Sequence, residues 1–209
     1  MAFLQNIPRV TRNLILINVL VFVMFLINSN FMVEYFALFY PASPYFKFWQ
    51  PLTHMFVHGG FWHIFFNMYT LMIFGGVVEQ IIGEKKFLIL YFVCGLGAAG
   101  LHLAVQAIGG GSDIPCVGAS GAIYGLIMAY AILFPDSKLT LLFPPVTLSA
   151  KWMVIIFVAI ELVTGIGGNL VTFTDGIAHF AHLGGMLFAW LLIKYWKARG
   201  TLFNRENFS

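Results

Sequence analysis

Charged residues are scarce in this sequence: Asp, Glu, Lys and Arg together make up 9% of its 209 residues. Soluble domains carry about 25% charged residues, so this composition excludes an ordinary soluble domain. Hydrophobic residues make up 60% of the chain and the mean hydropathy is +0.90, which is typical of a protein that crosses a membrane several times. The formal net charge is +3 and the basic residues are spread along the chain, so we expect no nucleic-acid partner.

Cysteine is also nearly lacking, since the chain holds only Cys94 and Cys116, both in or beside apolar stretches. Two such residues provide neither a disulfide framework nor a metal-binding spacing, and they do not reveal the redox compartment. Internal repeats and low-complexity runs are lacking as well. We therefore expect one domain over residues 1–209 and no second folded unit.

Long apolar runs are what the sequence has in abundance. Six of them approach the ~20 residues that an α-helix needs to cross the hydrocarbon core. They cover residues 13–29, 59–80, 86–107, 115–134, 149–168 and 177–196. Arg9 and Arg12 precede the first run as in a signal peptide, but this run is long enough to span and no small-x-small cleavage site follows it. The sequence therefore predicts an all-α bundle of six transmembrane helices.

The distribution of basic residues predicts the orientation of this bundle. If the N-terminus is cytoplasmic, the inner segments hold ten of the eleven Lys and Arg residues, and the outer segments hold only Lys47. Cytoplasmic loops are enriched in Lys and Arg. We therefore expect both the N-terminus and the C-terminus in the cytoplasm.

Polar side chains gather at one depth of the predicted bundle. Ser120 comes about five residues after the start of the fourth run, roughly 8 Å along a helix. His179 and His182 lie at a similar depth in the sixth run, and His63 and Asn67 do so in the second. Polar groups inside a membrane are costly and usually face the bundle interior or a water-filled cavity. This layer, near the outer face, is the candidate functional site.

Ser120 has two interpretations. It stands in the sequence Gly118-Ala119-Ser120-Gly121, and small residues at such spacings let two helices pack closely. The nucleophile motif of soluble hydrolases, G-x-S-x-G, is not matched, because Ala122 stands in place of its last glycine. This motif alone does not separate a packing residue from a nucleophile.

His182 favours the nucleophile. A serine hydroxyl needs a neighbouring base, and histidine suits that role near neutral pH. Gly185 and Ala189 continue the His182 side of the sixth helix, so that side can approach the glycine-rich surface next to Ser120. Such packing would bring the hydroxyl and the imidazole together. His179, three residues before His182, either shares this site or has an ordinary partner in the backbone or in lipid headgroups.

No acidic residue completes a catalytic triad on the basis of spacing. Asp175 precedes His182 by seven residues, about 10 Å along a helix, which is too far for a hydrogen bond. Glu161 lies in the fifth run but has no spacing relation to the histidines. The sequence therefore favours a Ser120–His182 dyad. Tyr124, one turn after Ser120, either stacks on the imidazole or is an ordinary packing residue.

Three further histidines precede or begin the second run. His63 and Asn67, four residues apart on one helical face, can stabilise an oxyanion, although hydrogen bonding between helices also explains them. His54, His58 and His63 raise the alternative of a metal or haem site, because imidazole is a common ligand. No His-x-x-Glu-His set is present, and the two cysteines are badly placed to contribute.

These residues fall in motifs that resemble those of the rhomboid intramembrane serine proteases. Four motifs occur in the family's order: WQPLTHMFVHGGFWHIFFN (49–67), GGVVE (75–79), GASGAIYG (118–125) and AHLGGMLFA (181–189). One motif would be weak evidence, but four in order with the matching topology are specific. The resemblance extends from the first helix to the sixth, and it implies the minimal six-helix form that is typical of bacteria.

The resemblance implies a role for each residue of the candidate site. Ser120 would be the nucleophile and His182 the general base. His63 and Asn67, with the backbone N–H of Ser120, would stabilise the oxyanion. Tyr124 would be the aromatic residue that stacks on the catalytic histidine.

Two positions outside the site also relate to the family pattern. Glu79 matches a structural glutamate in the second helix. Many members carry Trp-Arg in the first loop, whereas this chain has Trp49 followed by Gln50, so an arginine does not anchor the loop at this position.

The function implied by the resemblance is hydrolysis of peptide bonds in or near transmembrane segments of other membrane proteins, through an acyl-enzyme. The expected partners are transmembrane substrates and the lipid bilayer, with no metal or organic cofactor. The expected location is a cell membrane, such as a bacterial plasma membrane, with the active site opening to the outer face. Two alternatives are a catalytically inactive rhomboid-like protein that binds clients and a histidine-ligated metal or redox bundle.

Water has to reach Ser120 from the outer face, so some element must open. The loop around Asp175 and the adjoining fifth helix are candidates for this gate. Glycines flank the loop on both sides: Gly165, Gly167, Gly168 and Gly176.

Overall fold

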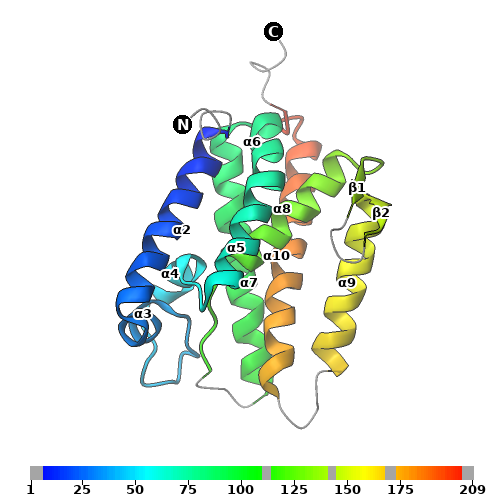
Figure 1. The fold of residues 1–209 in the computed structure, drawn as a ribbon. Coiled ribbons are helices and arrows are strands. Elements are labelled where there is room, and N and C mark those ends of the chain that lie inside the picture. Colours follow the sequence, from blue (N-terminus) through cyan, green and yellow to red (C-terminus); the bar gives the residue numbers. More distant parts are fainter. Residues whose placement is uncertain (1–6, 110–113, 141–144, 168–172, 204–209) are drawn as a thin grey trace.

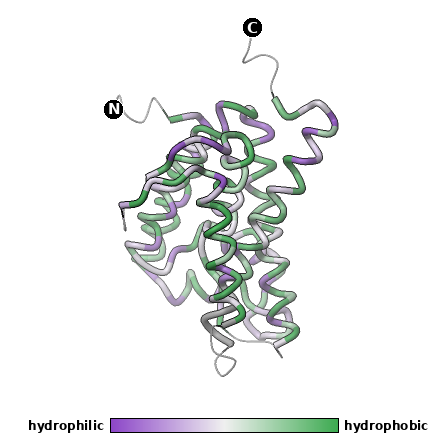
Figure 2. The backbone as a smooth tube through the Cα atoms, turned by 90° about the vertical axis from the view of Figure 1, so that its right-hand side faces the viewer, coloured by the Kyte–Doolittle hydropathy of each residue, from purple (hydrophilic) through white to green (hydrophobic). Residues whose placement is uncertain are grey.

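The computed structural model describes residues 7–109, 114–140, 145–167 and 173–203, without the side chains of residues 167 and 173–178. The described chain forms a bundle of long helices. The start of α2 (Arg9–Ile27) and the end of α10 (Phe173–Ala198) lie at the same end of this bundle (Figure 1). Hydrophobic residues occur along the whole length of the helices, as Figure 2 shows.

The remaining elements follow the predicted order of apolar runs. They are α3 (Ser29–Phe36), α4 (Gln50–Thr53), the 3-10 turn η1 (His54–Phe56), α5 (Phe61–Thr70), the π-helical segment η2 (Leu71–Gly75), α6 (Gly76–Ile82), α7 (Glu84–Ile108), α8 (Ser120–Leu133) and α9 (Ala150–Gly167). Between α8 and α9 lies an antiparallel pair of short strands, β1 (Lys138–Thr140) and β2 (Thr147–Ser149). Helix is thus the dominant structure, as predicted.

Length and hydropathy mark three helices in the described part of the chain as able to cross a membrane. They are α2, the continuous helix from Phe61 to Ile82, and α7. Helix α8 is apolar but has only 14 residues. The chain is therefore a helical membrane protein.

The fourth apolar run is not helical from its start, which corrects the predicted depth of Ser120. Helix α8 begins at Ser120, so this residue opens the helix and does not lie five residues inside it. The preceding segment is extended, and Cys116 exchanges two backbone hydrogen bonds of 2.9 Å with Leu38. Gly118 then donates its N–H to the carbonyl of His54 and adopts a φ of +117°. Side chains strain this conformation, so glycine is what lets the chain turn into α8.

Helices α7, α8 and α10 pack closely because small residues face one another. A Cβ atom added to Gly185 of α10 would lie 1.8 Å from the carbonyl oxygen of Gly121 in α8. A Cβ atom on Gly121 would lie 2.4 Å from that of Ala98 in α7, and one on Gly125 would lie 2.5 Å from Sγ of Cys94. The predicted approach of the sixth helix to the glycine surface of the fourth is confirmed. Backbones this close leave no room for larger side chains.

Glu79 joins the second long helix to the first. Its carboxylate accepts hydrogen bonds from the backbone N–H groups of Val10 (2.9 Å) and Thr11 (2.7 Å), and from the Thr11 hydroxyl (2.7 Å). These N–H groups belong to the first turn of α2, which has no intrahelical acceptors for them, and a negative charge suits a helix N-terminus. Glu79 and Thr11 are both buried. The carboxylate therefore has the structural role that the family pattern implies.

Gln50 anchors the loop that precedes α5. Its side chain is fully buried. The carbonyl oxygen Oε1 accepts from the N–H groups of Phe39 (3.3 Å) and Lys47 (3.1 Å), and Nε2 donates to the carbonyls of Glu34 (3.2 Å) and Tyr45 (3.0 Å). An amide can both donate and accept, so Gln50 binds backbone groups of both kinds. The loop thus has an anchor at the position where many family members have arginine.

Candidate active site

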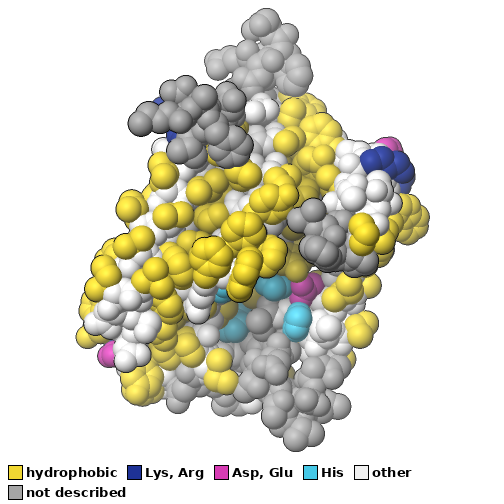
Figure 3. Space-filling view, in the orientation of Figure 1, with side chains coloured by type: hydrophobic (Ala, Val, Ile, Leu, Met, Phe, Trp, Pro, Cys, Tyr) yellow, Lys and Arg dark blue, Asp and Glu magenta, His cyan; other side chains and the backbone are white. Residues whose placement is uncertain are grey.

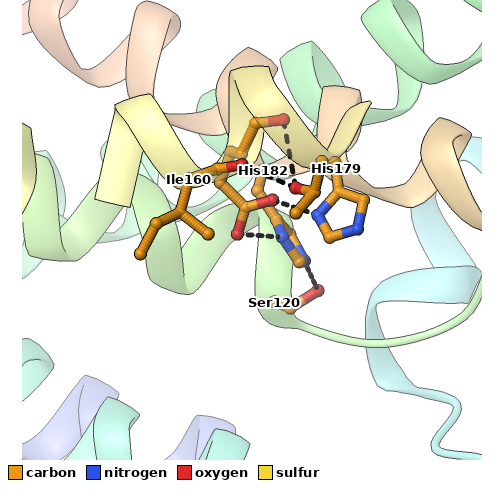
Figure 4. Close-up of polar contacts among 6 residues, drawn as sticks. Ser120, Ile160, His179 and His182 are labelled. Carbon is orange, nitrogen blue, oxygen red and sulfur yellow. Dashed lines mark hydrogen bonds and ion pairs between the residues drawn. The ribbon is translucent and has the colours of Figure 1, made fainter. Parts of the chain in front are cut away.

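The packing of α8 on α10 brings Ser120 and His182 together. Ser120 Oγ lies 2.9 Å from Nε2 of His182, a hydrogen-bond distance (Figure 4). Ser120 is the first residue of α8, and His182 lies one turn before Gly185, at which the two helix backbones meet. The sequence-based expectation that these two side chains meet is confirmed.

Glu161 of α9 completes a chain of polar contacts that the sequence did not reveal. Its carboxylate oxygen Oε1 lies 3.0 Å from Nδ1 of His182, and Oε2 lies 2.5 Å from Nδ1 of His179. An ionised carboxylate only accepts hydrogen bonds, so Nδ1 of His182 carries the proton. The other ring nitrogen, Nε2, is then free to accept the hydroxyl proton of Ser120. This tautomer is the one that a general base requires.

The structure therefore adds an acidic residue beside the predicted Ser120–His182 dyad. Glu161 lies 21 positions before His182, and the pair meets because α9 packs against α10. One signal in the sequence points to this residue: Glu161 is the only acidic residue in the apolar helix α9. Ionisable residues inside membranes usually have functional partners. The side chain of Asp175, the other acid considered, lies outside the described residues.

Tyr124 covers one face of the His182 imidazole. The two rings are stacked, with centroids 4.1 Å apart and an interplanar angle of 2°. Tyr124 lies one helical turn after Ser120, so the nucleophile candidate and the stacking ring come from the same side of α8. Its hydroxyl also lies near the carboxylate of Glu161. The stacked ring thus restrains the imidazole of His182.

His63 lies beside the turn that leads into Ser120. A Cβ atom on Gly118 would lie 2.7 Å from Nε2 of His63, so only a glycine leaves room for the ring. Asn67 is buried, and its side-chain amide donates to the carbonyl of His63 at 2.8 Å. That bond uses one of the two N–H groups of the amide. The structure therefore places His63 next to the backbone of the Ser120 turn and Asn67 one turn below it on α5.

His54, His58 and His63, the histidines of the metal or haem alternative, have separate contacts in the structure. Nδ1 of His54 lies 3.1 Å from the carbonyl of Gln50, and Nδ1 of His58 lies 3.2 Å from that of Phe56. The ring of His58 meets that of His63 edge to face at 5.0 Å. Across the described residues, ligand atoms of three candidate residues come together elsewhere, at Glu161, His179 and His182.

The site is reachable from one face of the molecule. Figure 3 shows histidine and acidic side chains in a recess bordered by hydrophobic side chains. The side chain of His179 is 32% exposed and that of His182 is 19% exposed, whereas Glu161 is almost fully covered. Aromatic side chains of α5 lie exposed on the outside of the bundle: Phe61, Trp62, Phe65 and Phe66. The polar side chains of the site are therefore accessible from outside the molecule, and hydrophobic side chains surround them.

The gate predicted around Asp175 falls largely outside the described part of the chain. Gly168 and the loop up to residue 172 are not described, nor are the side chains of Asp175 and its neighbours. Gly165 is described: a Cβ atom there would lie 3.1 Å from the ring of Phe180 and 3.4 Å from Cβ of His179. At this point α9 lies close against α10. The gate stays a prediction.

Fold and site together define a helical membrane protein that holds a serine, a histidine and a carboxylate in hydrogen-bonded series. The sequence profile of the Rhomboid domain matches residues 45–198, which include every residue of this site. The chain belongs to the rhomboid family.

Named relatives come from several kingdoms. The mitochondrial presenilin-associated rhomboid-like protein of Homo sapiens is 31% identical over 203 residues, covering 93% of this chain and 51% of that protein. The mitochondrial Rhomboid protein 1 of Saccharomyces cerevisiae is 30% identical over 148 residues, covering 66% of this chain and 40% of that protein. RHOMBOID-like protein 5 of Arabidopsis thaliana is 36% identical over 81 residues, covering 39% of this chain and 25% of that protein. The chain spans about half the length, or less, of these relatives.

Proposed function

We propose that this protein is an intramembrane serine endopeptidase that cleaves peptide bonds in or near transmembrane segments of other membrane proteins. The observation that carries the proposal is the hydrogen bond of 2.9 Å between Ser120 Oγ and His182 Nε2. A packing serine does not need an imidazole acceptor, and an imidazole held by a carboxylate is what a serine nucleophile needs. Membership of the rhomboid family supports the same activity.

In the proposed reaction, Ser120 Oγ attacks the carbonyl carbon of the scissile bond while Nε2 of His182 takes its proton. The resulting imidazolium keeps its Nδ1 proton, whose N–H donates a hydrogen bond to the ionised carboxylate of Glu161, and the negative charge of this carboxylate stabilises the imidazolium. The tetrahedral intermediate then collapses, the imidazolium gives its Nε2 proton to the leaving amine, and an acyl-enzyme remains. Water, deprotonated by the same nitrogen, attacks the ester and regenerates Ser120. Glu161 acts as a positioning residue, because it touches His182 and not the substrate.

The oxyanion of the intermediate needs hydrogen-bond donors. Ser120 opens α8, so its backbone N–H is one of the N-terminal groups that have no acceptor inside the helix, and the helix dipole favours negative charge there. His63, which packs on Gly118, and the second N–H of the Asn67 amide are the further donors of the proposal. Because the segment before Ser120 is extended, no preceding helical turn supplies an acceptor for the backbone N–H of Ser120.

We further propose that substrates approach through the recess and that the chain forms a bundle of six transmembrane helices in a bacterial plasma membrane, with both ends of the bundle in the cytoplasm. The excess of basic residues in the inner segments supports this orientation, and the site would then open to the outer face. Movement of α9, with the loop after it, would admit the substrate. A crosslink between α9 and α5 tests this: cleavage of a transmembrane substrate should stop, and unchanged cleavage would count against the gate.

The experiment that tests the activity is labelling with a fluorophosphonate, which reacts with activated serines. Wild-type protein should be labelled, and Ser120→Ala and His182→Ala should not. Ser149→Ala removes a buried serine at the end of β2 and serves as the matched control, with labelling retained. Equal labelling of all four proteins would refute the mechanism. Absence of labelling in the folded wild type would favour the inactive client-binding protein.

A further inference from the structure

We propose that Glu161, His179 and His182 form a binding site for a divalent transition-metal ion of the Zn²⁺ class, and that the bound ion switches the enzyme off. The effect on catalysis rests on the proposed protease function, whereas the binding of the ion does not. The three residues offer one carboxylate oxygen and two imidazole nitrogens, all within 4.8 Å of one another. Figure 4 shows both imidazoles directed at the same carboxylate.

The spacing of the donor atoms suits a tetrahedral ion. Zn²⁺ binds imidazole nitrogen and carboxylate oxygen at about 2.0–2.2 Å, so its ligand atoms lie roughly 3.3 Å apart. The carboxylate oxygens of Glu161 already lie 2.5 Å from Nδ1 of His179 and 3.0 Å from Nδ1 of His182. An ion can enter if the two carboxylate contacts widen by less than about 1 Å and if the most distant pair of donor atoms, which lie within 4.8 Å of each other, closes by up to about 1.5 Å. Two histidines and one glutamate also form a known zinc ligand set, with the fourth position open to water.

The fold holds these donors rigidly. His179 and His182 are three residues apart on α10, so their side chains lie one turn apart on neighbouring faces. Glu161 comes from α9, which approaches α10 so closely at Gly165 that a Cβ atom there would lie 3.4 Å from Cβ of His179. The donors therefore come from two packed helices and not from a loop. Preorganised donors of this kind lose little freedom when an ion binds.

The charge of the site favours a cation. Glu161 is 4% exposed, and a buried carboxylate is costly unless its charge is compensated. Its partners within the described residues are His179, His182 and Tyr124, and none of these carries a permanent positive charge. A divalent ion would supply that charge. Imidazole ligands select ions such as Zn²⁺, Cu²⁺ and Ni²⁺ over Mg²⁺ and Ca²⁺, which prefer oxygen.

Metal binding and catalysis would exclude each other. The ion takes the place of the Nδ1 proton of each histidine, and that proton is exchanged through solvent for one on Nε2, so both rings stay neutral and no proton is released overall. With Nδ1 of His182 bound to the ion, the neutral imidazole carries its single proton on Nε2. That nitrogen then donates to Ser120 Oγ and can no longer accept the hydroxyl proton. Glu161 is occupied at the same time, so the ion removes both the base and the residue that orients it.

Binding is tested first in the Ser120→Ala protein, folded in detergent micelles and purified without a polyhistidine tag. Isothermal titration with Zn²⁺ should show one tight equivalent, and the same titration with Mg²⁺ should show none. His179→Ala in this background should weaken Zn²⁺ binding at least about tenfold. His102→Gln, a substitution on α7, is the matched control and should leave it unchanged. Equal Zn²⁺ affinity with and without His179, or no binding at all, would overturn the proposal.

The second measurement asks whether the ion silences the site. Zn²⁺ should slow fluorophosphonate labelling of the wild type, EDTA should restore it, and His179→Ala should need at least about tenfold more Zn²⁺ for the same slowing. Zn²⁺ that binds but leaves labelling unchanged would refute the switch. If the wild type is not labelled under any condition while Zn²⁺ still binds, the protease function fails and the metal site stands.

Discussion

The carbonyl oxygen of Gly121 lies where a side chain on Gly185 would begin, 1.8 Å from the Cβ position, so the backbones of α8 and α10 are in direct contact. This contact sets the separation of Ser120 and His182, which lie one residue and three residues before these glycines. A hydroxyl and an imidazole can meet in a hydrogen bond of 2.9 Å only if the helices stay this close.

Gly185→Ala should therefore both destabilise the fold and abolish fluorophosphonate labelling. The added methyl group meets backbone, which cannot rotate away, so we expect a cost of about 1–3 kcal/mol in the free energy of unfolding. Gly100→Ala is the matched control, because the Cβ position of Gly100 on α7 has no neighbour within 4 Å. That change should leave activity intact and stabilise the helix by about 0.5–1 kcal/mol. Unfolding in mixed SDS micelles measures the stability of the two variants, and fluorophosphonate labelling measures their activity. Equal stability and equal labelling of the two variants would contradict the close contact.

Glu161→Gln should lower kcat for a transmembrane substrate by about 10²–10⁴-fold while KM changes little. The uncharged amide no longer stabilises the imidazolium of His182 and no longer keeps the proton of the neutral imidazole on Nδ1. It does not change the contacts with the substrate. Glu161→Asp keeps the charge and should recover part of the lost kcat. Steady-state cleavage kinetics in proteoliposomes separate the two constants. A rise in KM alone, or identical loss with Gln and Asp, would show that Glu161 only supports the fold.

Tyr124→Phe and Tyr124→Ala separate the ring of Tyr124 from its hydroxyl. Phe keeps the stacking on His182 and should retain most of the labelling rate. Ala removes a contact between rings 4.1 Å apart and should slow labelling by about two- to tenfold, which corresponds to the ~0.5–1.5 kcal/mol of an aromatic pair. If Phe loses as much as Ala, the hydroxyl contact with Glu161 matters more than the stack.

Glu79→Gln should destabilise the bundle without changing the chemistry at Ser120. The neutral amide has only one accepting oxygen for the three hydrogen bonds from Val10 and Thr11, and it places no negative charge at the start of α2. We therefore expect the free energy of unfolding to fall by about 1–3 kcal/mol. The exposed residue Glu34 offers the control Glu34→Gln, with stability within about 0.5 kcal/mol of the wild type. SDS unfolding gives the stability, and the labelling rate of the folded fraction should match that of the wild type.

Much of this protein could be predicted from local patterns in the sequence. Apolar runs of membrane-spanning length predict the helices, because each helix satisfies its own backbone hydrogen bonds and depends little on its neighbours. The small residues of 118–125 and of 181–189 predict the close approach of α8 and α10, because helix periodicity determines which side chains share a face. The meeting of Ser120 with His182 follows from these two local facts.

Only the tertiary structure decided the rest, because it depends on how separate helices are placed. Glu161 reaches His182 from α9, and no spacing within one helix encodes a contact across 21 residues and two helices. The start of α8 at Ser120 depends on the pairing of Cys116 with Leu38, which lies far away in the chain. In the same way Gln50 anchors the loop only because four backbone groups, one from α3 and three from the loop, converge on its amide. Sequence periodicity determines the faces of each helix, whereas packing between helices determines which faces meet.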